Sequence, residues 1–145
     1  MKIALGSDHA GFQLKSNIIE HLKTAERSYD DFGVFSEESA DYPDLAALVA
    51  KAVLSGECKY GILICGTGIG MSIAANKYKG IRAALCGETY SAHCARKHTN
   101  ANVLTMGSRV IGPGLAVEIV EAFLNTSFEG GRHLRRLDKI TTIEG

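Results

Sequence analysis

Five strand-like runs alternate with helix-like segments along the whole 145-residue chain, and all but the second, which contains two aspartates, are apolar. The runs that we predict as strands are 2–6, 28–33, 60–65, 81–86 and 103–106. The segments predicted as helices are 12–22, 43–55, a short one from about 70, 90–98, 113–124 and one from about 134. Strands separated by helices pair in parallel, so we predict a single Rossmann-like α/β/α sandwich with a five-stranded parallel sheet. We expect the strand order 2-1-3-4-5, a common doubly wound arrangement.

Length and charge limit the classes of function. The length fits one domain over residues 1–145, with a basic C-terminal tail from about 130. Lysine plus arginine and aspartate plus glutamate balance at 16 each, so the chain lacks the broad basic field of nucleic-acid-binding proteins. Any anion that it binds should be small and recognised locally.

The four cysteines indicate a compartment. They are Cys58, Cys65, Cys86 and Cys94, and no C-x-x-C pair occurs among them. The first residues do not resemble a signal peptide, and no apolar stretch approaches the ~20 residues that span a membrane. We therefore expect reduced thiols in a cytoplasmic protein without a membrane partner.

Two unusual stretches follow the first and third predicted strands. They are Gly-Ser-Asp-His-Ala-Gly at 6–11 and Cys-Gly-Thr-Gly-Ile-Gly at 65–70. In open parallel sheets, ligands bind beyond the carboxyl ends of the strands, where the strand order reverses. With the expected order this point lies between strands 1 and 3, so both stretches should face one crevice.

Cys65 ends a buried strand, and three of the next five residues are glycines. Glycines allow backbone N–H groups to turn inward and form an anion-binding nest at a helix N-terminus. The positive end of that helix also favours a thiolate. The alternative interpretation is a buried cysteine followed by an ordinary tight turn.

Known phosphate-binding motifs do not fit this loop. A dinucleotide G-x-G-x-x-G fingerprint would need glycine at Met71 or Ile73, and no Walker A Gly-Lys-Ser/Thr is present. A cysteine phosphatase would need arginine where Met71 stands. The loop is therefore an anion cradle of some other kind.

Asp8 and His9 follow the first strand. A carboxylate beside an imidazole suits contacts to sugar hydroxyls or to phosphate. Asp8 could equally cap the helix that follows, and the two roles are compatible.

Two pairs of residues lie four apart and could each share a helix face. Arg132 and Arg136 would form a fork for phosphate, although exposed arginines often have no such role. Cys94 and His98 could bind a metal, but two ligands are too few and Cys94 falls on the apolar side. We therefore expect no metal.

Several motifs together resemble the type B ribose-5-phosphate isomerase family. They are 6–11, Asp-Tyr-Pro at 41–43, 65–70 with Ser-Ile-Ala-Ala-Asn-Lys at 72–77, Ala-Asn-Val-Leu at 101–104, and Glu-Gly-Gly-Arg at 129–132. The resemblance covers essentially the whole chain. It implies a homodimer or a pair of dimers, no cofactor, and interconversion of ribose 5-phosphate and ribulose 5-phosphate through an enediolate, in the pentose phosphate pathway.

The resemblance also implies roles for individual residues. Cys65 would take the proton from C2 and return it at C1. The enediolate would be held by the backbone of Gly66, Thr67, Gly68, Ile69 and Gly70, with the Thr67 side chain near the same oxygens. This agrees with the nest inferred above, because preorganised N–H donors stabilise a developing oxyanion. His98 would open the furanose ring with help from Asp8.

The resemblance assigns phosphate contacts to His9, Arg109, Arg132 and Arg136. Thr99 departs from the family pattern, which has asparagine directly after the ring-opening histidine. Threonine lacks the reach and the two-ended amide of asparagine, so the sugar-hydroxyl contact at Thr99 should differ.

Topology predicts a shared site. Helices of this fold run back against the strands, so His98 at the end of its helix should point away from Cys65 of the same chain. A second copy would have to supply the histidine, which makes the dimer a catalytic requirement.

Two alternatives to ribose 5-phosphate isomerisation remain. A 6-phosphohexose (allose or galactose 6-phosphate) isomerase would keep the chemistry and change the substrate. A non-catalytic sugar-phosphate-binding module would have no use for a thiol beside an oxyanion nest, so Cys65 separates it from the enzymes.

Overall fold

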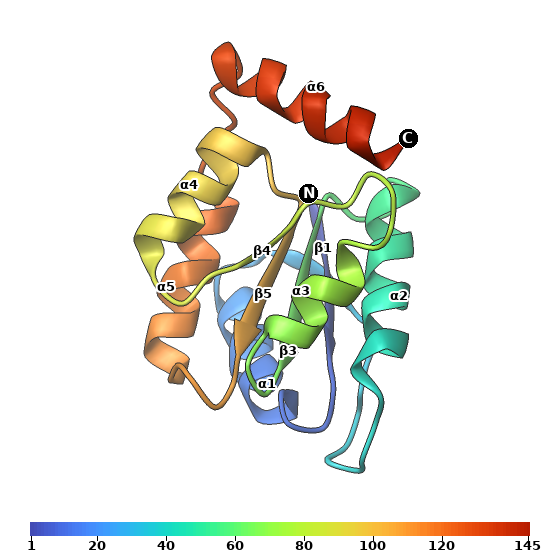
Figure 1. Ribbon diagram of the computed structural model, residues 1–145. Coiled ribbons are helices and arrows are strands. Elements are labelled where there is room, and N and C mark those ends of the chain that lie inside the picture. The colour runs from blue at the N-terminus through green and yellow to red at the C-terminus, as the bar shows by residue number, and fades with distance from the viewer.

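The computed structural model describes residues 1–145 as one parallel sheet wrapped by helices (Figure 1). The elements are β1 (Lys2–Ser7), α1 (Phe12–Thr24), β2 (Ser28–Asp31), α2 (Tyr42–Leu54), β3 (Tyr60–Cys65), α3 (Ile69–Ala75), β4 (Ala83–Leu85), α4 (Thr89–Thr99), β5 (Val103–Gly107), α5 (Pro113–Leu124) and α6 (Arg132–Glu144). The predicted α/β/α class is confirmed.

The strand order is β2-β1-β3-β5-β4, so the predicted order 2-1-3-4-5 is wrong at one edge. Every residue of β5 is buried, as a strand with neighbours on both sides requires. The partly exposed β4 has only three residues, and Leu85 is 44% exposed. The longer buried strand therefore pairs with β3, and the short strand becomes the edge.

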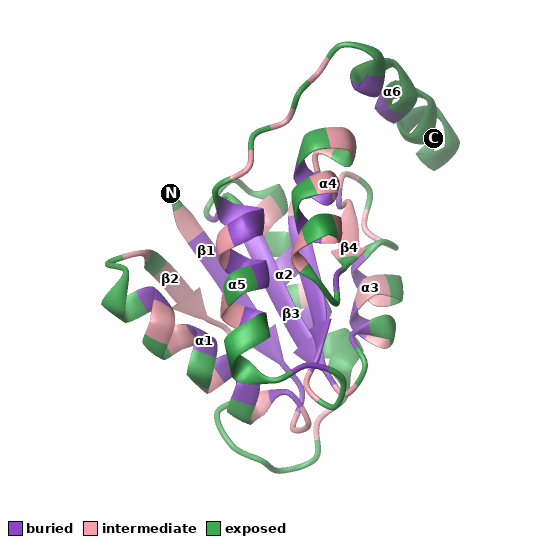
Figure 2. Cartoon of the chain, turned by 90° about the vertical axis from the view of Figure 1, so that its left-hand side faces the viewer, coloured by how far each residue is buried: buried purple, intermediate pink, exposed green.

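Two apolar cores cover the two faces of the sheet. On one face, side chains of α1, α4 and α5 pack on the strands, including the predicted stripe Leu14, Ile18 and Leu22. On the other face, α2 and α3 pack on β1 and β3, and this core includes Cys65. Figure 2 shows the strands buried between these helical layers. No helix is both long and apolar enough to cross a membrane.

The C-terminal helix α6 lies beyond the amino ends of the strands, away from the main body (Figures 1 and 2). It starts at Arg132, slightly earlier than predicted, and buries only His133 and Leu137. It is attached by a stack of the His133 ring on the ring of His98 in α4, with centroids 4.5 Å apart, and by a hydrogen bond from the N–H of Gly80 to Glu144 over 2.9 Å. The tail therefore presents most of its residues to solvent in the single chain.

Candidate active site

The thiol of Cys65 accepts a hydrogen bond from the loop that follows it. The backbone N–H of Gly68 donates to Sγ over 3.2 Å, and the cysteine is only 5% exposed. The next N–H, of Ile69, donates to the hydroxyl of Thr67 over 3.2 Å. The loop thus places the N–H of Gly68 against the thiol and the N–H of Ile69 against the hydroxyl of Thr67.

Gly68 makes this loop possible. Its φ of +80° is in the left-handed region, and an added Cβ would lie 2.5 Å from Leu85 and 2.8 Å from the backbone of Met106. The hydroxyl of Thr105 in β5 also donates to the Gly68 carbonyl over 3.0 Å. Any side chain at this position would push the loop off β5 and misplace the N–H that contacts Cys65.

The segment after β5 fixes the other side of the loop. The backbone N–H groups of Ser108 and Arg109 donate to the carbonyls of Cys65 and Gly66 over 2.9 and 3.0 Å. A methyl group on Gly66 would lie 3.2 Å from Nη1 of Arg109, so the guanidinium covers this glycine. Arg109 therefore places an exposed positive charge beside the Cys65 loop, where an anionic group could meet it.

Asp8 and His9 lie next to this loop, since the N–H of Asp8 donates to the carbonyl of Ile64 at the end of β3. Oδ1 of the buried Asp8 accepts from the N–H of Gly11 over 3.0 Å, so Asp8 closes the turn before α1 and leaves Oδ2 for a ligand. Nδ1 of His9 accepts from the N–H of Ala40 over 3.1 Å. A neutral His9 therefore carries its proton on Nε2, where it can donate to an anion.

The other buried cysteines are poor candidates for a base. Burial, with a smaller effect of Glu88, raises the pKa of Cys86 to about 11. Burial and the negative charge of Asp30 also raise the pKa of Cys58. Both remain protonated thiols near neutral pH, and neither accepts an N–H from a glycine loop.

A second group of polar residues lies around α6. His98 stacks on His133, and Glu129 lies beside both rings, 3.7 Å from Nε2 of His98 and 3.6 Å from Nε2 of His133. Burial, with the nearby charges of His98 and Arg132, lowers the pKa of His133. His133 is therefore neutral near pH 7.

The remaining predicted residues belong to this second group. Arg132 and Arg136 lie one turn apart on α6 and are exposed, as a phosphate fork requires. The hydroxyl of Thr99 donates to the carbonyl of Ala95 over 2.6 Å. This internal bond occupies the only hydroxyl proton of Thr99, so its side chain can offer a ligand only an acceptor.

The predicted site residues thus separate into two groups at opposite ends of the strands. Cys65 pairs with Gly107 at the carboxyl end of β5, whereas His98 lies on α4 shortly before β5 begins at Val103. The length of β5 between these ends is about 13 Å. Figure 1 shows α6 beyond the amino ends of the strands, at the end of the sheet opposite the carboxyl end of β3. Within one chain, His98 does not join the Cys65 group.

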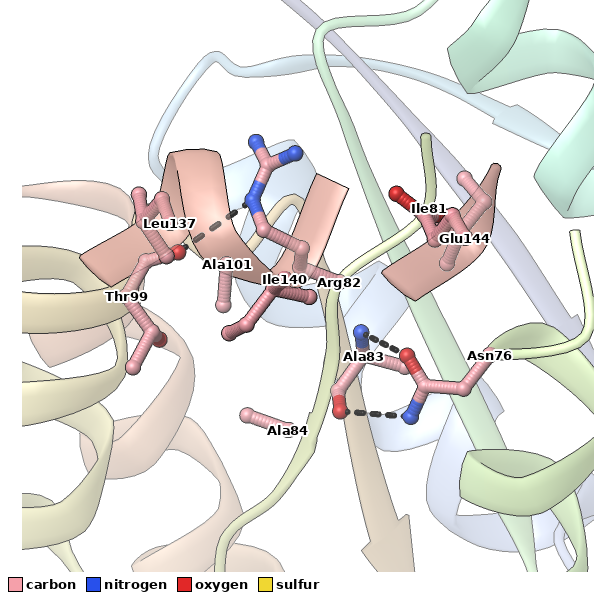
Figure 3. Close-up of a pocket in the computed structure, with 10 residues that line it drawn as sticks. All are labelled: Asn76, Ile81, Arg82, Ala83, Ala84, Thr99, Ala101, Leu137, Ile140 and Glu144. Carbon is pink, nitrogen blue, oxygen red and sulfur yellow. Dashed lines mark hydrogen bonds between the residues drawn. The ribbon is translucent and has the colours of Figure 1, made fainter. Parts of the chain in front are cut away.

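Two cavities flank the edge strand β4. The one drawn in Figure 3 has a volume of about 430 Å³ and lies between α6 and β4. It is mostly apolar and contains only Thr99 among the predicted residues. A cavity of about 340 Å³ adjoins the Cys65 loop through Thr67 and Ile69 and is also lined by the exposed Leu85 and Val110. The apolar lining at the loop is surface that a single chain leaves uncovered.

Sequence reasoning missed several residues around these groups. Tyr42 belongs to the Asp-Tyr-Pro motif at 41–43, but the sequence did not indicate its contact with the loop. An added Cβ on Gly70 would lie 2.6 Å from the Tyr42 ring, which therefore packs on the loop. Ser108 hydrogen-bonds to the carbonyls of Cys65 and Ala10, joining the two predicted stretches. Glu129 and His133 lie close to the predicted Arg132 in the sequence, and this proximity was the only signal in the sequence that could have pointed to them.

Comparison with known proteins gives one consistent result. Residues 3–140 match the family model described as Ribose/Galactose Isomerase. The chain is 54% identical over 143 residues to ribose-5-phosphate isomerase B of Escherichia coli strain K12, with 99% of this chain and 96% of that protein covered.

Solved structures agree with the sequence match. Ribose-5-phosphate isomerase B of Clostridium thermocellum superposes with a TM-score of 0.98 at 53% identity, covering 99% of this chain and 97% of that one. The Mycoplasma genitalium protein of the same name, solved with bound ribulose-5-phosphate, has a TM-score of 0.93 at 48% identity, covering 99% and 95%.

Proposed function

Because the chain belongs to the ribose/galactose isomerase family, we propose that it interconverts ribose 5-phosphate and ribulose 5-phosphate in the pentose phosphate pathway. The observation that supports this most directly is the buried Cys65 thiol, which accepts the N–H of Gly68 at the start of a glycine-rich loop. The four cysteines are all free, which fits our assignment of the enzyme to the cytoplasm.

Proton transfer is the chemical step that we assign to Cys65. The thiolate removes the proton from C2 of the open-chain aldose, and the electrons form an enediolate as the C1 carbonyl oxygen becomes negative. The same sulfur then returns the proton to C1, while the hydroxyl on C2 gives up its proton and the oxygen on C1 gains one, which leaves a hydroxyl at C1 and the carbonyl at C2. Backbone donors of the loop stabilise the oxyanion. No redox equivalent is gained or lost, so we assign no cofactor.

Ring opening is the step that we assign to His98 of a second copy of the chain. The substrate exists mainly as a furanose, and opening it requires a proton to leave the anomeric hydroxyl and another to reach the ring oxygen. Within one chain His98 lies at the amino ends of the strands, remote from Cys65. We therefore propose a homodimer, alone or as half of a tetramer, in which each site combines Cys65 and Asp8 of one chain with His98 of the other.

Phosphate binding is the role that we assign to His9, Arg109, Arg132 and Arg136. His9 and Arg109 lie with Cys65, and the two α6 arginines lie with His98. In the proposed dimer both pairs face one substrate.

Arg132→Ala should raise KM about ten- to a hundredfold with a smaller change in kcat. The loss of a charge-assisted contact costs about 1.5–3 kcal/mol, and the phosphate is bound equally before and during the reaction. Steady-state kinetics with ribose 5-phosphate measure this. Arg135→Ala is the matched control, because Arg135 is also exposed on the same helix and has no assigned contact. Equal KM values for Arg132→Ala and Arg135→Ala would remove Arg132 from the phosphate site.

The substrate is tested by comparing ribose 5-phosphate with allose 6-phosphate on the purified protein. We expect the higher kcat/KM for the pentose. Thr99→Asn restores the amide of the family pattern. It should change the ratio of kcat/KM for ribose 5-phosphate to that for allose 6-phosphate, because the Thr99 hydroxyl now offers a ligand only an acceptor. A preference for allose 6-phosphate would reassign the protein as a hexose-phosphate isomerase. Binding of both without turnover would leave only a binding module.

A further inference from the structure

Three side chains from separate parts of the chain converge at the base of α6. They are His98 on α4, Glu129 in the segment after α5, and His133 on α6. One ligand atom of each lies within 4.8 Å of the other two. The Glu129 N–H donates to the carbonyl of Lys97 over 3.1 Å, which holds the carboxylate next to His98.

The spacing of these atoms is not that of hydrogen bonds. The N···O distances are 3.7 and 3.6 Å, whereas an N–H···O bond measures about 2.7–3.2 Å. Two ligands of one tetrahedral zinc ion, each about 2.0–2.2 Å from the metal, lie about 3.4 Å apart. The two separations between the Glu129 carboxylate and the imidazoles are therefore closer to those of ligands that share a cation.

The chemistry of the cluster agrees with its spacing. Two imidazoles and one carboxylate make a ligand set that binds zinc with a fourth position left open. His133 is only 8% exposed, so its position is fixed by packing. The nearby Arg132 repels a cation, so we expect weaker binding than at a buried structural zinc site.

We propose that His98, Glu129 and His133 form a binding site for Zn²⁺, and that the bound ion inhibits the enzyme by occupying His98. The two rings now stack with their planes 17° apart, so one of them must tilt to share an ion. His98, whose side chain is 42% exposed against 9% for His133, is free to do so. The binding site stands on geometry alone, whereas inhibition rests on the ring-opening role proposed above for His98.

A rival zinc ligand in this protein is the thiol of Cys65, because thiolates also bind zinc and would give inhibition of their own. The experiment therefore compares purified wild type with His133→Asn, which leaves every cysteine in place. His93→Asn is the matched control: His93 is on the same helix as His98, but its ring hydrogen-bonds to Thr126 outside the cluster.

Zinc affinity is measured by competition with a chromophoric chelator, using ZnCl₂ as the only metal. Wild type and His93→Asn should bind one ion per chain at this site, and His133→Asn should bind it at least about tenfold more weakly. Equal affinity in wild type and His133→Asn, or no binding to wild type, would overturn the site. Cobalt bound to wild type adds a check independent of folding of the variant. Visible bands without a thiolate charge-transfer band support the cluster, and a thiolate band refutes it.

Inhibition is measured on the same three proteins with the cyclic substrate. Zinc should inhibit wild type and His93→Asn at concentrations that leave His133→Asn at least about tenfold less affected. If zinc binds the cluster by the chelator assay but the loaded enzyme keeps its full rate, the inhibitory half is wrong and the ring-opening role of His98 is called into question. That result leaves the metal site itself intact.

Discussion

Cys65→Ser is expected to lower kcat by about a thousandfold or more while the protein still folds and binds the substrate. A serine hydroxyl stays protonated near neutral pH, so its oxygen cannot accept the C2 proton, whereas a thiol with a pKa near 8.5 in free cysteine supplies a thiolate. The hydroxyl still accepts the N–H of Gly68, so the loop should persist. Steady-state kinetics, thermal unfolding and calorimetric binding of ribose 5-phosphate measure the three quantities.

Cys94→Ser is the control for this experiment, because Cys94 is a free thiol on α4 away from the loop. It should retain nearly the wild-type rate. If Cys65→Ser itself keeps more than about a tenth of the wild-type kcat, another group moves the proton and Cys65 is a packing residue. Loss of substrate binding together with the rate would instead indicate that the loop had collapsed.

The second large effect is recovery of activity on mixing two inactive variants. Cys65→Ser and His98→Asn should each be inactive as homodimers, one in proton transfer and the other in ring opening. After they are unfolded and refolded together, about half of the dimers are mixed. Each mixed dimer has one site with both defects and one site with neither. About a quarter of the wild-type activity should therefore return.

The controls for this test are the two variants refolded separately, and a mixture refolded from Cys65→Ser and Cys65→Ser/His98→Asn chains, which can form no intact site. Native mass spectrometry confirms that mixed dimers are present. If they form and no activity returns, His98 serves its own chain or has no catalytic part. The assignment of Cys65 would be unaffected.

Local patterns in the sequence were sufficient for the class of fold but not for the strand order. The spacing of Leu14, Ile18 and Leu22 matches the buried face of α1, because a helix repeats its environment every three to four residues. The order of β4 and β5 depends on which strand fits between two neighbours. Both runs are short and apolar, and the difference in burial that decides their order is a tertiary property.

The same limit applies to the candidate site. Asp8, His9 and Cys65 could be placed together from the sequence, since the ends of adjacent parallel strands meet at one edge. The stack of His98 on His133 could not be predicted, because it depends on where α6 packs in the folded chain. The hydroxyl bond of Thr99 to Ala95 was likewise hidden, as threonine in a helix can either bond internally or face solvent.

In the proposed dimer, the combination of the two groups across the two chains would have a consequence for inheritance. A cell that makes wild-type chains together with chains lacking only Cys65 keeps one working site in each mixed dimer. Chains lacking both Cys65 and His98 behave differently: the wild-type cysteine then meets a defective histidine, and the wild-type histidine meets a defective cysteine. A chain made from such an allele leaves both sites inactive in every dimer that it forms with a wild-type chain. The doubly altered gene is therefore dominant, whereas either single lesion is largely masked.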